Sequence, residues 1–292
     1  MSTRKNAGAM TPAQLEARYG GIHEFNITEV IIPITEAREI AERVYRSHGF
    51  KNAGSLLSIG AIDKLEKTRS HQLVALALLP ANASGIVNTC AFAGECASGC
   101  VAFSGNGSFS NTVRSRLART DLVVNHPRVF VTLLVHELTS AAEKFGTLGI
   151  RLNAYSDLRY ERMLPRDFFT TFSAHTFYDY TKHTTRSRPA HTLPDNYRLT
   201  YSYSERTTMR EINANLDSGR NVAVVVATRS GKNPTTKQYR PIPATLLGHP
   251  VVDGDMSEDR FADAPNSFVV LRRKHTLRAD SPFIFTAENV RV

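Results

Sequence analysis

Short apolar segments with strand character alternate with stretches that suit helices along most of this 292-residue chain. A compact apolar run over residues 72–79 is closed by Pro80 and suits a buried strand. Further strand-like segments follow at residues 150–154, 174–178, 197–203, 222–227, 250–252 and 268–271. Because strands that alternate with helices usually pair in parallel, the pattern predicts an α/β fold. Either a parallel sheet with flanking helices or a partial (βα) barrel satisfies it.

Helical periodicity marks three longer segments of the chain. Apolar positions recur along one face of residues 35–48. His126-Pro127 marks the start of another helix, and residues 130–145 show helical periodicity before Gly146 ends it. Residues 113–122 suit a helix that carries several arginines. Residues 1–30 show no such pattern, so we expect them to form a loose lead-in.

The order of these elements suggests two parts. We expect residues 1–69 to form an N-terminal lead-in and helical segment, and residues 70–292 to form an α/β barrel-like domain that carries the cysteines. The hydrophobic fraction of 41% and the charged fraction of 22% are ordinary for a globular protein.

Polar side chains that are able to take part in catalysis or ligand binding follow most of the predicted strands. In parallel α/β folds, sites are assembled at the carboxyl ends of strands, so these side chains are candidates for one site. The proposed catalytic residues are Asp157, Tyr178, Tyr180 and Lys182, and the proposed cofactor-binding residues are Asn153, Ser202 and Asp253.

Each of these candidates also has a structural interpretation. Asp157 can accept a hydrogen bond from a ligand, or it can cap the next helix. The tyrosines and Lys182 can donate a proton and hold a phosphate or carboxylate, or the tyrosines can form an aromatic edge of the core. Asp253 lies in an Asp-Gly-Asp run that resembles a cation loop faintly, and an Asp–Arg pair that fixes a loop explains it better.

All three cysteines of the chain, Cys90, Cys96 and Cys100, fall within eleven residues. A disulfide uses two thiols and leaves one over, whereas a closed structural zinc site needs four ligands. Three thiolates can hold a [4Fe-4S] cluster and leave one iron open for a ligand. This count favours an iron–sulfur cluster at Cys90, Cys96 and Cys100.

Two other interpretations of the cysteines remain. Zinc fits if a histidine supplies the fourth ligand, and His71, His126 and His175 are the candidates. Three cysteines without any metal are the second alternative. The spacing alone does not decide between these possibilities and the cluster.

The chain carries a formal net charge of +9, which favours an acidic partner such as nucleic acid. Arg114, Arg116 and Arg119 repeat at near-helical spacing and are candidates for contacts with phosphates. A solvated basic surface explains the same charge. No apolar run approaches the roughly 18 residues of a membrane span, and no secretory signal is visible. With clustered thiols, these features predict a cytoplasmic protein.

Several motifs resemble, in their order, a family of phage-encoded proteins known only by a gene-product number. The resemblance covers about residues 70–275. The motifs are Asn88-Thr89-Cys90 with Cys96 and Cys100, residues 151–158, residues 177–182, residues 199–202, residues 221–226 and residues 252–255. The cysteine segment is similar to that of radical-SAM enzymes.

The likeness to radical-SAM enzymes implies a partial (βα) barrel, a [4Fe-4S] cluster on three cysteines and S-adenosylmethionine on the open iron. This chain departs from that pattern, because five and then three residues separate its cysteines instead of three and then two. Gly99 also replaces the usual aromatic residue before the last cysteine. The expected function is that of a phage iron–sulfur protein in the host cytoplasm. The alternative is a metal-stabilised nucleic-acid-binding protein without catalysis.

Overall fold

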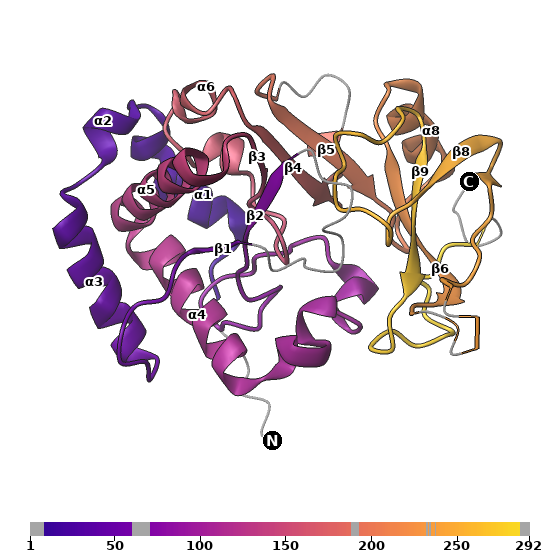
Figure 1. Cartoon of the computed structure of the whole chain (residues 1–292), viewed down its shortest axis with the longest axis horizontal. Helices are drawn as coiled ribbons and strands as arrows, with labels where there is room; N and C mark the ends of the chain where they lie inside the picture. The colour runs from indigo at the N-terminus through magenta and orange to yellow at the C-terminus, as the bar shows by residue number, and fades with distance from the viewer. Residues whose placement is uncertain are drawn as a thin grey trace. The chain divides into compact units, whose positions relative to one another are not determined.

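The computed structural model describes residues 9–59, 71–187, 193–231, 233, 235–236 and 238–286 (Figure 1). These residues form two compact units. The first unit comprises the described parts of residues 1–61, 71–91 and 105–177. The second unit comprises residues 92–104 and the described residues from 178 onward.

Within the described residues, nine strands follow the hydrogen-bonded order β1-β2-β3-β4-β5-β6-β9-β8-β7. The pairs β2–β3, β3–β4, β5–β6, β6–β9 and β8–β9 are parallel, whereas β1–β2 and β7–β8 are antiparallel. The strands are β1 (Leu57–Ile59), β2 (Gln72–Leu76), β3 (Leu148–Arg151), β4 (Thr176–Thr181), β5 (Tyr197–Ser202), β6 (Val222–Arg229), β7 (Thr245–Leu246), β8 (His249–Asp253) and β9 (Phe268–Arg273). The mostly parallel sheet confirms the predicted α/β class.

The α-helices occupy the segments between and before the strands. They are α1 (Pro12–His23), α2 (Ile27–Val30), α3 (Ile34–Ser47), α4 (Ser110–Asn125), α5 (Pro127–Phe145), α6 (Phe168–Thr171), α7 (Thr184–Ser187) and α8 (Met209–Asp217). No helix within the described residues is both long enough and apolar enough to cross a membrane.

The first unit packs its helices around the short strands β1 to β3. Strand β2 is almost wholly buried, as the apolar run predicts, and Val74 pairs with Ile150 of β3 in parallel register. Helix α5 packs against α3 and α4 (Figure 1). The Tyr19 hydroxyl of α1 donates a buried hydrogen bond of 2.6 Å to the Val123 carbonyl of α4.

The prediction of a loose lead-in over residues 1–30 was wrong for its described part. Helix α1 begins at a capping box in which Thr11 and Gln14 satisfy each other's backbone N–H groups. The ion pair between Glu16 and Arg159, with N···O distances of 2.5 and 2.6 Å, fixes this helix to the rest of the first unit. The apolar spacing of α1 is weak, so its amphipathic signal is easily missed.

The second unit is built on the parallel strands β5, β6, β9 and β8. Its core combines apolar side chains of the central strands with those of α8, such as Ile212 and Leu216. Thr208 caps α8 by accepting a hydrogen bond from the Glu211 N–H. The register between β6 and β9 shifts between Val226 and Arg229, so a bulge interrupts the end of this long pair.

Candidate functional site

Cys90 follows strand β2 in the first unit, next to the segment that follows β3. The Thr89 hydroxyl donates a hydrogen bond of 2.7 Å to the Leu79 carbonyl, and the Asp157 N–H donates to the Thr89 carbonyl at 2.8 Å. The Cys90 thiol donates to the Tyr155 carbonyl, with 3.3 Å between sulfur and oxygen. The segments after two neighbouring parallel strands are therefore tied together beside this thiol.

Asn153 shapes the turn that follows β3. Its side-chain carbonyl accepts hydrogen bonds of 2.8 Å from the Ser156 hydroxyl and from the Leu158 N–H, while its amide donates to the Leu158 carbonyl at 3.0 Å. Asn153 is also only 2% exposed. The structure therefore gives this predicted cofactor-binding residue a structural role in the turn that carries Tyr155 and Asp157.

The arginines of α4 take part in packing within the first unit. The guanidinium of Arg116 lies 4.5 Å from the centroid of the Tyr155 ring, and Arg116 is buried. Arg119 donates to the Ser55 carbonyl at 3.0 Å, and Arg114 lies over the Phe50 ring. The expectation that this helix contacts phosphates stays a prediction, and burial of Arg116 removes one of its three cations from such a surface.

Cys96 and Cys100 belong to a segment of the second unit that is built from short turns. The 3-10 helices η2 (Gly94–Ala97) and η3 (Val101–Phe103) form this segment. Gly94 has a φ of +51°, and a Cβ added there would lie 2.1 Å from the Glu205 carboxylate. The backbone at this position therefore requires glycine, for its conformation and for its close approach to Glu205.

The same segment is held against residues near the C-terminus. A Cβ added at Gly99 would lie 2.6 Å from Leu277, and the Thr276 hydroxyl donates to the Gly99 carbonyl at 3.0 Å. The Cys96 side chain packs against a buried apolar cluster that contains Leu277 and Phe283. Sequence reasoning did not single out residues 276–284, because no local pattern links them to the cysteines.

The carboxyl ends of β4 and β5 meet at a hydrogen bond between two of the predicted site residues. The Lys182 ammonium donates to the Ser202 hydroxyl at 2.7 Å, and it also lies 4.9 Å from the centroid of the Phe283 ring. The ring of the next residue, His183, contacts that of Phe92 of the cysteine segment in a tilted arrangement, with ring centroids 4.4 Å apart. Within the second unit, the cysteine segment thus lies against the strand ends.

Other predicted site residues pack against neighbouring side chains or form ion pairs within the fold. Tyr178 is 1% exposed, and its ring packs edge-to-face against Phe261. Tyr180 is partly exposed and follows on the same strand. Asp253 forms a two-bond ion pair with Arg272, with N···O distances of 2.6 and 2.7 Å. The sequence suggested an Asp–Arg pair from the run that ends at Arg260, whereas the arginine that pairs with Asp253 is Arg272 of β9.

None of the three cysteines forms a disulfide, and each is partly exposed. Cys90 lies in the first unit, whereas Cys96 and Cys100 lie in the second. Across the described ranges, no group of three or more His, Cys, Asp or Glu side chains is placed to hold a metal ion. The metal expected from the sequence therefore stays a prediction.

A family model described as Gene product 88 matches residues 54–287. The chain belongs to this family. The match includes all three cysteines and strands β1 to β9, and it excludes helices α1 to α3. The family description names no reaction or ligand, and it confirms the expectation of a numbered gene-product family of the phage type. Searches among curated proteins and among solved structures found no match.

Proposed function

We propose that Cys90, Cys96 and Cys100 bind a [4Fe-4S] cluster. One observation carries the proposal: in each unit, the part of the chain that bears the cysteines lies beside polar groups that follow parallel strands. In the first unit, the residues around Cys90 are hydrogen-bonded to the segment after β3. In the second unit, the segment that bears Cys96 and Cys100 contacts His183 after β4. This edge is where α/β proteins assemble their sites.

The donor chemistry supports the same proposal. Thiolates are the protein ligands that iron in clusters prefers, and none of the three sulfurs is used in a disulfide. The apolar side chains around Cys96 exclude water from one side of that sulfur, which affects the potential of a bound cluster. To ligate iron, Cys90 must lose its proton and therefore its hydrogen bond to Tyr155.

Lys182 and Ser202 are the residues we propose to hold an anionic ligand. Their hydrogen-bonded pair combines a cation and a hydroxyl at adjacent strand ends, a combination that suits a carboxylate or a phosphate. When bound, a cluster on three cysteines supplies one iron that can bind a ligand and transfer an electron. S-adenosylmethionine is the ligand to test first, because its carboxylate matches the Lys182 ammonium.

A partial (βα) barrel is the architecture that we propose to accompany this chemistry. From β2 to β6, each strand neighbours the one that follows it in the sequence, without the reversal that defines a doubly wound sheet. Sequential order is what a (βα) barrel requires.

The proposed reaction class is reductive or radical.

Iron, sulfide and zinc content of protein purified without oxygen tests the cluster. We expect about four iron and four sulfide per chain and a visible thiolate-to-iron absorbance. Replacement of all three cysteines by alanine removes both, whereas Ser98→Ala, a change in the same segment, retains them. Iron that persists in the triple variant overturns the proposal. Stoichiometric zinc without iron replaces it with a structural metal site.

A further inference from the structure

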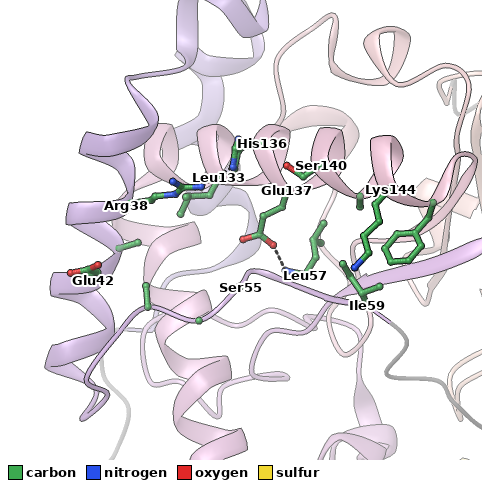
Figure 2. Close-up of a pocket in the computed structure, with 15 residues that line it drawn as sticks. Arg38, Glu42, Ser55, Leu57, Ile59, Leu133, His136, Glu137, Ser140 and Lys144 are labelled. Atoms are coloured by element: carbon green, nitrogen blue, oxygen red, sulfur yellow. Dashed lines mark hydrogen bonds between the residues drawn. The ribbon is translucent and has the colours of Figure 1, made fainter.

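A cavity of about 440 Å³ lies in the first unit, away from the cysteines in the sequence. Its walls come from α3, from α5 and from residues 53–59, which lead into β1 (Figure 2). The volume falls within the range of small-molecule sites, roughly 300–1,000 Å³. Sequence analysis assigned no role to the side chains that line it.

Apolar side chains form much of the cavity lining. Leu57, Leu133 and Ala141 line it and are buried, whereas Ile59 and Phe145 line it and are 48% and 37% exposed. Exposed large apolar side chains next to a hollow are typical of a surface that a ligand covers. The cavity therefore suits a molecule with an apolar body.

Each carboxylate at the cavity already accepts hydrogen bonds from other groups of the chain. Glu137 accepts a hydrogen bond of 2.8 Å from the Leu56 N–H and one of 2.9 Å from the Leu57 N–H. Figure 2 shows the bond from Leu57. Glu42 is paired with Arg46 at 2.7 Å. Neither carboxylate therefore bonds to Arg38 or Lys144, the two cations that line the cavity.

Two cations remain at the cavity. The Arg38 guanidinium donates to His136 Nε2 at 2.9 Å, so the imidazole orients it without neutralising it. Lys144 lies over the Phe145 ring, 5.0 Å from its centroid. Within the part of the chain that the structure describes, no carboxylate forms an ion pair with Arg38 or Lys144.

The cations lie toward opposite ends of the apolar surface (Figure 2). His136 and Lys144 are eight residues apart on α5, which corresponds to about 12 Å at the helical rise. An anionic group bound by Arg38 therefore has an apolar surface extending from it toward Ile59 and Phe145. A guanidinium binds carboxylates through paired hydrogen bonds, which a carboxylate-bearing ligand satisfies best.

We infer that this cavity binds an amphipathic carboxylate, with its anionic group on Arg38 and its apolar chain along α5 toward Phe145. Decanoate is the probe, and isothermal titration calorimetry on the full chain is the measurement. We expect one saturable site. Affinity rises by up to about fourfold for each methylene from hexanoate to decanoate, because each buries apolar surface.

Matched variants locate the site. Arg38→Gln weakens decanoate binding by about tenfold, the loss expected for a charged hydrogen bond. Arg43→Gln, an exposed change on the same helix outside the cavity lining, leaves it unchanged. Ser140→Trp fills the mouth from an exposed position and abolishes binding. Circular dichroism establishes that each variant is folded.

Four outcomes overturn the inference. They are the absence of saturable decanoate binding, equal losses in Arg38→Gln and Arg43→Gln, equal affinity for decanoate and decylammonium, and an affinity that does not change with chain length. Concentration-dependent dimerisation that Ser140→Trp abolishes, without decanoate binding, assigns the cavity to a second copy of the chain instead.

Discussion

The Lys182 ammonium donates a hydrogen bond of 2.7 Å to the Ser202 hydroxyl, which joins the carboxyl ends of two neighbouring strands. The two residues are twenty positions apart and were each proposed for the site from local sequence alone. Their contact places a cation at the edge where the cysteine segment also lies in the second unit. The same contact provides a first test of the strand-end geometry.

Ser202→Ala should lower the free energy of unfolding by about 1 kcal/mol, because it removes the acceptor of a partly exposed, charged hydrogen bond. Urea denaturation measures the loss. Ser202→Thr keeps the hydroxyl in a strand that tolerates a β-branched residue, so its stability should stay near that of the parent. Equal losses in the two variants would contradict the role given to the hydroxyl.

Gly94→Ala should destabilise the chain by about 1–3 kcal/mol, because the left-handed backbone and the Glu205 carboxylate both oppose a Cβ. Gly85→Ala is the control, since its φ is +70° and no atom lies within 4 Å of the added Cβ. Its loss should be the smaller one. Adding Glu205→Ala should restore part of the stability of Gly94→Ala, and no restoration would exclude the steric explanation.

Asp253→Asn should cost about 1–2 kcal/mol, because Arg272, whose side chain is 2% exposed, loses the charge of its two-bond partner but keeps its ion pair with Asp255. Thermal and urea denaturation measure the change. Asp280→Asn removes a carboxylate from an exposed pair with Arg278, so it should produce no measurable loss. Similar stability of both variants would show that the Asp253 pair does not fix its loop.

Glu137 should make stability depend on pH in a defined direction. Burial raises the pKa of this carboxyl, and the N–H groups of Leu56 and Leu57 offset part of that effect. The folded chain therefore holds this proton more tightly than the unfolded chain does. The stabilising contribution is complete below the unfolded pKa, about 4.3, and is lost as pH rises through the folded pKa.

Glu137→Gln removes this titration and keeps an acceptor for one backbone N–H. As pH rises through that window, the parent should lose stability relative to Glu137→Gln, measured by urea denaturation at a series of pH values. Glu143→Gln, an exposed change on the same helix, controls for the loss of one charge. A difference between parent and variant that grows in the parent's favour with rising pH would show the opposite sign.

Much of the sheet was predictable because strand signals are local. The segment expected over residues 197–203 is strand Tyr197–Ser202, and the helix whose start is expected at His126-Pro127 begins at Pro127. Strand β1 escaped prediction because three residues are too few to show alternation. Local patterns do not specify which strands pair, so they do not predict whether the parallel strands close into a barrel.

The sequence alone determined most of the longer strands and helices, although not α1 or β1, and it placed three thiols and several polar side chains after strands. Only the tertiary structure decided what those side chains contact. Tyr178, proposed as a proton donor, is buried against Phe261, and Asp253 is paired with Arg272. The physical reason is that strand and helix formation depends on neighbours along the chain, whereas ion pairs and burial depend on residues that the topology brings together from distant positions.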